Sequence, residues 1–241
     1  MFKHCTIRAP FFEIGPKNYL YGDDVLDLAL AADAASEKYK VDIIFTTPYT
    51  EIRRVKENTR HLHVFAPHMD PLKPGRGLAD VLAEAVKAAG AEGVMLNHCE
   101  KPISLGQLRE SILRADEAGL VTIVCADSIA EAGAVAKLNP NIVVPEPTEL
   151  VGTGQTSDEE YVRASTEAVK SVNPEILVLQ GAGIKCYADV YRNIYAGADA
   201  TGCSSGIAGL PTREARNAMV DEMIRAVREA YDARQAKEAR Q

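Results

Sequence analysis

The most informative stretch of this 241-residue chain reads Ile142-Val143-Val144-Pro145-Glu146-Pro147-Thr148-Glu149-Leu150-Val151-Gly152-Thr153-Gly154. Its first four residues form a continuous apolar run, which is typical of a strand buried on both faces in a parallel sheet. The carboxylate of Glu146 follows directly at the end of that strand. Pro147 restricts the first hinge of the next loop, whereas Gly152 and Gly154 free the second, so the pattern suggests a general base beneath a movable lid. An ordinary strand-to-helix loop with a solvated glutamate would give the same local pattern.

Apolar runs and segments of helical period alternate along the whole chain. Val121-Thr122-Ile123-Val124-Cys125 is another run without polar alternation, and apolar residues recur at 3.6-residue spacing between about Asp23 and Tyr39. Capping-box patterns at Ser104 and Ser157 predict the starts of two helices. We expect strands at 11–14, 42–46, 62–65, 93–97, 121–125, 142–145, 176–179 and 198–203, and helices near 23–39, 50–55, 78–89, 104–119, 128–138, 157–173, 186–196 and 213–231.

Eight strands in strict alternation with eight helices predict a parallel sheet that helices cover. In about 250 residues, eight such units close most simply into a (β/α)8 barrel. An open doubly wound sheet is the alternative, but the first strand is followed by Gly15-Pro16-Lys17 rather than by G-x-G-x-x-G. We therefore expect a single TIM-barrel domain over residues 1–241, with a polar tail from about residue 232 that extends the last helix and frays.

Composition excludes several classes of protein. No run of 18 apolar residues occurs and the N-terminus lacks the apolar core of a signal peptide, so we expect a soluble, cytoplasmic protein with no membrane partner. The net charge of -7 gives no basic patch for nucleic acid. The five cysteines are widely spaced and contain no C-x-x-C pair, which argues against a disulfide framework and a structural zinc site. We expect no metal site, because the histidines form no ligand cluster.

Ionisable and small residues gather where the predicted strands end. In a (β/α)8 barrel these carboxyl ends carry the chemistry. Lys17 follows the first strand, His98 and Glu100 follow the fourth, and Glu146 follows the sixth. Each could be an ordinary solvated or core side chain, but together with phosphate-type turns they form a coherent site for a phosphorylated carbonyl compound. Backbone N–H groups of the turns after the last two strands would hold the phosphate; these turns contain Gly181, Gly183, Ser205 and Gly206.

These residues resemble those of triosephosphate isomerases, particularly the short archaeal-type enzymes, over nearly the whole chain. The resemblance implies that Glu146 is the catalytic base, His98 the electrophile and Lys17 the electrostatic residue, with 147–154 as the closing lid. It also implies that Gly152 helps to bind substrate and that Glu100 and Cys99 support the reacting groups from behind. No metal or organic cofactor is then needed. The matching segments are Lys17-Asn18-Tyr19, Leu96-Asn97-His98-Cys99-Glu100, Cys125, Glu146-Pro147, Leu150-Val151-Gly152-Thr153-Gly154, Gly181-Ala182-Gly183-Ile184 and Ser205-Gly206.

Two departures from the family pattern concern substrate and assembly. The family has Asn-x-Lys where this chain has Gly15-Pro16-Lys17, and Glu13 is a further unfamiliar group at the same strand end. The missing amide suggests room for a longer substrate, so an isomerase of four-carbon sugar phosphates such as erythrulose phosphate is a close alternative. The segment from Pro67 to Gly77 replaces the third-loop region that helps to build subunit contacts in relatives. We expect a homodimer or homotetramer.

Two other classes of protein fit the same fold. The chain could be an inactive barrel that binds sugar phosphates, or an aldolase in which Lys17 forms a Schiff base. An intact Glu146, His98 and lid argue against the inactive protein, and borohydride trapping with substrate would reveal the lysine adduct of an aldolase. In each case the partner is a small phosphorylated sugar.

Overall fold

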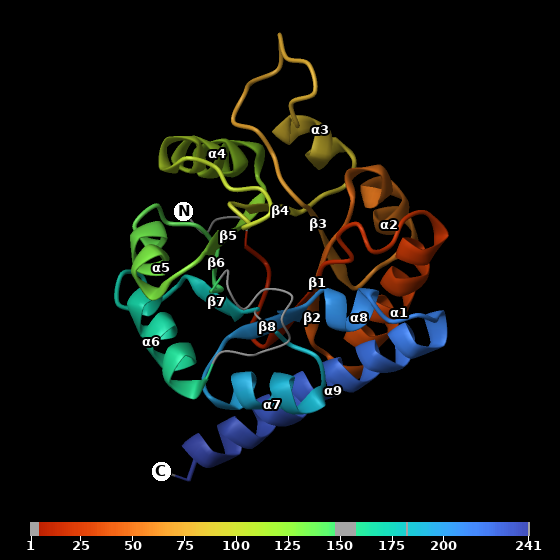
Figure 1. Cartoon of the computed structure of the whole chain (residues 1–241), viewed down its shortest axis with the longest axis vertical. Coiled ribbons are helices and arrows are strands. Elements are labelled where there is room, and N and C mark those ends of the chain that lie inside the picture. The colour runs from red at the N-terminus through yellow and green to blue at the C-terminus, as the bar shows by residue number, and fades with distance from the viewer. Residues whose placement is uncertain (1–4, 148–157, 182, 241) are drawn as a thin grey trace.

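A computed structural model describes residues 5–147, 158–181 and 183–240. Eight parallel strands form a closed barrel in chain order, with β8 paired to β1, and helices surround them (Figure 1). The predicted (β/α)8 fold is therefore confirmed. The strands are β1 (Phe11–Ile14), β2 (Asp42–Thr46), β3 (Leu62–Ala66), β4 (Gly93–Leu96), β5 (Val121–Ala126), β6 (Ile142–Pro145), β7 (Leu177–Gln180) and β8 (Ala200–Cys203).

The helices lie outside the barrel, and the long α9 packs against α1 and α7 (Figure 1). The helical segments are α1 (Asp23–Tyr39), the 3-10 turn η1 (Tyr49–Glu51), α2 (Ile52–Asn58), α3 (Ala83–Ala88), α4 (Leu105–Ala118), α5 (Ile129–Ala136), α6 (Glu159–Lys170), α7 (Tyr187–Tyr195), α8 (Ser205–Ala208) and α9 (Arg213–Glu238). The short α8 follows β8 and is additional to the eight helices expected from the apolar pattern. The polar segment from residue 232 continues α9, and Arg234 Nη1 donates to the carbonyl of Ile194 at 2.9 Å.

The sheet separates two apolar layers, which explains why its strands are apolar without alternation. Phe12 and Ile14 belong to the layer between strands and helices, whereas Phe11 packs with Ile44 and Phe65 inside the barrel. All of these side chains are completely buried. Because successive residues of a strand point to opposite faces, Glu13 shares the inward direction of Phe11. A carboxyl group thus enters the interior near the carboxyl ends of the strands, the end of the barrel called the mouth below.

Helix starts agree with the sequence in one case and differ in another. Ser104 caps α4 through the predicted capping box, with its hydroxyl accepting from Gln107 N at 3.3 Å and the Gln107 side chain accepting from Ser104 N. In α6 the cap is Asp158 instead, whose carboxylate accepts from Tyr161 N at 2.8 Å. Ser157, the predicted cap, lies outside the described residues. An aspartate three residues before a free N–H satisfies the same donor.

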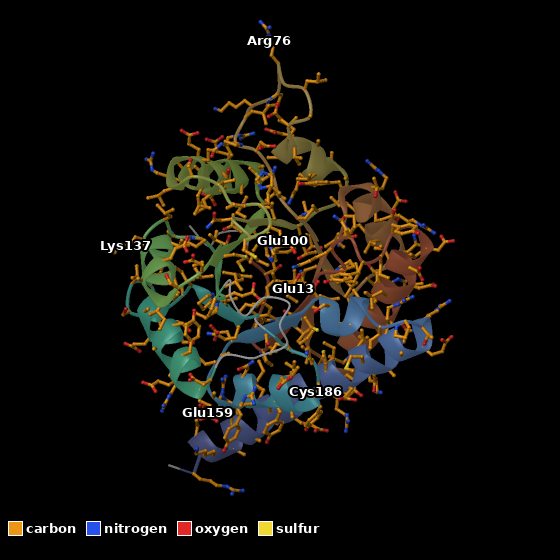
Figure 2. The ribbon with its side chains drawn as sticks, in the orientation of Figure 1. Glu13, Arg76, Glu100, Lys137, Glu159 and Cys186 are labelled. Carbon is orange, nitrogen blue, oxygen red and sulfur yellow. The ribbon has the colours of Figure 1, made fainter. Side chains whose placement is uncertain are left out.

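The third helix is shorter than predicted and begins at Ala83 rather than Leu78. Ala79 has a left-handed φ of 72°, which a helix cannot continue through, and Leu78 is 96% exposed. Asp70 closes the intervening loop, because its N–H donates to Val81 O at 2.9 Å and its carboxylate accepts from Val81 N at 2.7 Å. Residues 71–80 therefore project from the barrel, with Arg76 at the tip (Figure 2).

Gly93 is a position where the barrel has no space for a side chain. A Cβ there would lie 2.3 Å from the ring of Phe65 and 2.6 Å from Val121 O. We expect Gly93→Ala to lower the free energy of unfolding by about 1 to 3 kcal/mol through overpacking, as measured by urea denaturation. Gly133→Ala is the matched control, since a Cβ in α5 meets only ordinary contacts from 3.6 Å. It should be neutral or stabilising, and equal effects of the two changes would contradict the packing described.

Candidate active site

The mouth of the barrel brings together the ionisable residues that the sequence singled out. Lys17, His98 and Glu146 follow β1, β4 and β6, and Lys17 acts electrostatically on both of the others. Glu100 lies near the centre of the ring of helices, as does Glu13 (Figure 2). Gly152 and the rest of the predicted lid after Pro147 lie outside the described residues. The described site therefore consists of the strand ends and the turns after β7 and β8.

The turn after β4 fixes the orientation of His98. Asn97 has a left-handed φ of 58°, and its side chain donates to Cys125 O at 3.0 Å and accepts from Ile103 N at 3.1 Å. The first bond attaches the turn to β5, and the second holds the loop that leads to α4. Sequence reasoning gave Asn97 no part in the site, although asparagine is one of the residue types that tolerates this backbone conformation.

A backbone donor determines which nitrogen of His98 carries the proton. Glu100 N donates to Nδ1 at 3.1 Å, so Nδ1 is an acceptor and the neutral ring carries its proton on Nε2. Burial lowers the pKa of His98, and the positive charge of Lys17 lowers it further. The ring thus presents a neutral N–H donor. Cys99 lies beside it, with Sγ 3.8 Å from Nδ1, and burial raises the pKa of this thiol.

Lys17 and Glu100 form an ion pair between the ends of β1 and β4. Lys17 Nζ lies 3.3 Å from Glu100 Oε2, and the lysine side chain is 28% exposed while the glutamate is 62% exposed. Exposed pairs of this kind contribute about 0 to 1 kcal/mol, so the pair positions the ammonium group more than it stabilises the fold. Lys17 itself has a left-handed φ of 47°, a conformation that costs a non-glycine residue about 1 kcal/mol.

Glu146 lies over a position on β7 that has no side chain. Its backbone N–H donates to Ala126 O at 2.8 Å, which continues the pairing of β6 with β5. A Cβ on Gly181 would be only 2.9 Å from Glu146 Oε1, so the glycine makes space for the carboxylate. Burial raises the pKa of Glu146, and the nearby Lys17 partly offsets that rise. A carboxylate in this setting is a stronger base than a solvated one.

Glu13 is a second carboxyl group at the same end of the barrel. It is 8% exposed, and its neighbours across the β1–β8 pair and after β1 are glycines. A Cβ on Gly15 would lie 3.1 Å from Glu13 Oε1, and one on Gly202 would lie 3.1 Å from Oε2. The space that the missing side chain of Gly15 was expected to leave is therefore bordered by this carboxyl group. The sequence feature that pointed to this carboxyl group is a charged residue, Glu13, within an apolar strand.

The surroundings of Glu13 favour its protonated form. Burial raises its pKa to about 7, while Thr46 and Lys17 lower the pKa and the negative charge of Glu146 raises it. The Thr46 hydroxyl lies near enough to act on this carboxyl group, but neither Glu13 Oε1 nor Thr46 Oγ1 makes a hydrogen bond of normal geometry within the described residues. The buried thiols of Cys125 and Cys203 also face this carboxyl group, and burial raises the pKa of both.

The turns after β7 and β8 pack against each other through glycine. Gly183 has a left-handed φ of 72°, and a Cβ on Gly206 would lie 2.7 Å from Ile184 O. Cys203 Sγ donates to the same Ile184 carbonyl at 3.1 Å. Ser204 Oγ donates to Gly15 O at 2.6 Å and so joins these turns to the end of β1. Ser205 begins α8.

All five cysteines are free thiols. Within residues 5–147, 158–181 and 183–240, His, Cys, Asp and Glu form no group of three or more that could hold a metal ion. In that same part of the chain no helix is both long and apolar enough to cross a bilayer.

The raised pKa of Glu13 predicts a pH dependence of stability. Its folded pKa of about 7 lies above the ordinary value of 4.5. Between these values the folded protein binds more protons than the unfolded chain, so stability is lost as the pH rises. Relative to Glu13→Gln, the wild-type free energy of unfolding should fall by about 2 to 3 kcal/mol between pH 5 and pH 8, measured by urea denaturation. A constant difference between the two proteins would contradict the raised pKa.

Known proteins resemble this chain in sequence and in fold. The triosephosphate isomerase of Methanothermus fervidus is 36% identical over 189 residues, which cover 77% of this chain and 85% of that protein. The enzyme of Methanocaldococcus jannaschii is 35% identical over 211 residues, covering 86% and 93%. The crystal structure of triosephosphate isomerase from Bartonella henselae superposes with a TM-score of 0.72 at 14% identity, covering 94% of this chain and 100% of that one, which shows the fold.

The sequence profile of the triosephosphate isomerase family matches residues 17–226. Because that match spans most of the chain and relatives align over most of their own length, this chain belongs to the triosephosphate isomerase family.

Proposed function

We propose that this protein interconverts glyceraldehyde 3-phosphate and dihydroxyacetone phosphate, the reaction for which its relatives are named. The observation that carries the proposal is the meeting of three groups at the mouth. They are a carboxylate with a raised pKa, a neutral histidine that presents an N–H, and a lysine whose charge acts on both. Proton transfer between adjacent carbons needs a base and a stabiliser for negative oxygen, and these groups supply both.

Glu146 is the base in this proposal. It takes a proton from the carbon next to the carbonyl group, and the electron pair moves into a carbon–carbon double bond to give an enediolate. The proton then returns to the former carbonyl carbon while the proton of the neighbouring hydroxyl passes to the enediolate oxygen. This completes the isomerisation without any loss of electrons from the substrate. Burial brings the pKa of this carboxylate closer to neutral pH, where a base transfers protons most effectively.

His98 and Lys17 stabilise the enediolate oxygens. His98 donates through Nε2–H, because Glu100 N occupies Nδ1. A neutral histidine of lowered pKa is the known electrophile of this enzyme family. The ammonium group of Lys17 adds positive charge and is held by Glu100. In this ion pair Lys17 contacts Glu100 as a cation and not as a nucleophile, which does not support a Schiff-base aldolase.

The turns after β7 and β8 bind the phosphate in this proposal. Gly183, Ser205 and Gly206 lie in two turns that pack together, and Gly206 allows their backbones to approach closely. Backbone N–H groups in such turns bind anions without a charged side chain. We also propose a homodimer or homotetramer, because the segment from Pro67 to Gly77 stands where relatives of this family build subunit contacts and its loop projects from the barrel (Figure 2). Sedimentation equilibrium would test this assembly.

Replacing the base tests the mechanism directly. Glu146→Gln keeps the shape of the side chain but cannot abstract a proton, so kcat should fall by a factor on the order of 10² to 10⁴ in a coupled isomerase assay. The exposed Glu110→Gln on α4 is the control and should leave kcat unchanged. Normal turnover by Glu146→Gln would rule out the proposed base.

Inorganic phosphate tests the anion site without turnover. Millimolar phosphate should raise the melting temperature of the wild-type protein, because a ligand that binds only the folded state stabilises it. Gly206→Ala should abolish most of this shift, since a Cβ would lie 2.7 Å from Ile184 O and separate the two turns. Gly133→Ala should keep the full shift. Equal shifts in all three proteins would place the anion elsewhere.

A further inference from the structure

Glu13 and Glu146 flank a part of the mouth that is lined by two glycines, Gly181 directly after β7 and Gly202 in β8. The strands lie in the order β6, β7, β8, β1 around the barrel. The Cβ direction of Gly181 points at Glu146, and that of Gly202 points at Glu13. Each glutamate is therefore accommodated by a glycine on a neighbouring strand. The proposed mechanism uses Glu146 and leaves Glu13 without a part.

One oxygen of Glu13 lacks the partner that buried polar atoms normally have. Oε1 is buried and makes no hydrogen bond of normal geometry with any described residue, although the Thr46 hydroxyl lies near enough to lower the pKa of the carboxyl group. Leaving such an atom unpaired costs about 1 to 3 kcal/mol, which is why nearly all buried polar groups are paired. Oε1 lies on the side of Gly15, beyond which the chain turns to Lys17. A ligand that reacts beside Lys17 is in position to supply the missing partner.

The charges around Glu13 determine what kind of partner it takes. Lys17 and Thr46 favour the carboxylate, whereas burial and the negative charge of Glu146 favour the neutral acid. A phosphorylated substrate that develops enediolate charge adds a further anion beside this group. A nearby negative charge favours protonation of a carboxyl group. In the complex Glu13 is then an O–H donor to a substrate oxygen.

We propose that Glu13 is a substrate-binding residue, whose carboxylic acid donates a hydrogen bond to an oxygen of the sugar phosphate between Lys17 and Glu146. Gly15 has no side chain, and the carboxyl group of Glu13 reaches the space where one would lie. Glu13 is two residues earlier in the chain and points to the same face of β1. The inference rests on the proposed isomerase function. It adds a hydrogen-bond donor to that site. It also implies that substitutions at positions 13 and 15 have non-additive effects, because the two side chains would occupy the same space.

An exchange between positions 13 and 15 tests the coupling. Gly15 is not among the residues with left-handed φ, so an asparagine can follow its backbone. Gly15→Asn alone should impair the enzyme, because its Cβ lies 3.1 Å from Glu13 Oε1. Glu13→Ala alone should lower kcat/KM for glyceraldehyde 3-phosphate by roughly ten- to a hundredfold through loss of the donor. The double variant Glu13→Ala/Gly15→Asn should regain at least about threefold over Glu13→Ala.

Glu13→Gln separates a donor from a merely structural residue. The amide keeps an N–H and cannot ionise, so its kcat/KM should stay within about threefold of wild type at pH 6. As Glu13 ionises above pH 7, the ratio of wild-type to Glu13→Gln kcat/KM should fall at least about threefold by pH 8.5. Glu92→Gln is the control, because Glu92 binds His63 and Lys56 outside the site. Its ratio to wild type should not change with pH.

Two results would overturn the role of Glu13. The first is a double variant Glu13→Ala/Gly15→Asn whose fold loss in kcat/KM equals the product of the losses in the two single variants. The second is a ratio of wild-type to Glu13→Gln kcat/KM that stays constant with pH. Circular dichroism and thermal melts establish that each variant is folded, and the near-isosteric Glu13→Gln keeps the test available if Glu13→Ala unfolds. A wild-type protein that turns over neither triose phosphate contradicts the proposed function itself, and with it this inference.

Discussion

The ammonium group of Lys17 is the charge on which the mouth of this barrel depends. It opposes the effect of burial on the pKa of both Glu13 and Glu146, and it lowers the pKa of His98. Two carboxyl groups enclosed at one end of a sheet would otherwise repel each other at low dielectric. Glu100 holds this cation from the exposed side. One residue thus limits the rise in the pKa of Glu146, the proposed base, and favours a neutral His98, which is the combination that enolisation needs.

The site also requires three positions without a side chain. Gly181, Gly202 and Gly15 lie where a side chain would meet one of the two glutamates. The rest of the barrel interior has the opposite character, since Phe11, Ile44 and Phe65 fill it. The lower part of the interior is therefore a packed core, and only the upper part has space for polar groups. The lower ends of the strands therefore contribute mainly to stability, and their carboxyl ends carry the groups of the candidate site.

Much of the fold was predictable because it follows from local patterns. Continuous apolar strands and the capping box at Ser104 each predicted what the structure has. The start of α3 was not predictable, because the Asp70–Val81 contacts that replace its first turns join residues 11 apart. The cap of α6 was assigned one residue too early because Ser157 and Asp158 both have capping side chains.

The candidate site was predictable where the chain matches its family and not where it departs. Lys17, His98 and Glu146 could be named from strand ends, but their roles still await kinetic tests. Glu13 was visible as an unfamiliar carboxylate, yet its burial depends on the register that sets it against Gly202. Register across a closed barrel is a long-range property that no local pattern encodes. For the same reason, the sequence suggested empty space at Gly15 where the structure has a carboxyl group.

The Asp70–Val81 clasp has a consequence for how this family can diversify. Both of its hydrogen bonds lie at the base of the loop, so the ten residues beyond it carry no part of the barrel's pairing. Each doubling of such a loop costs only about 0.6 kcal/mol in closure entropy. Beyond Leu72, whose carbonyl accepts from Arg114 on α4, natural drift, insertion or grafting can therefore change this segment while the strands keep their register. The tip of the loop can therefore change its contacts with other molecules, whereas the strand ends must keep the geometry of the site. Asp70 lies where the two regions meet.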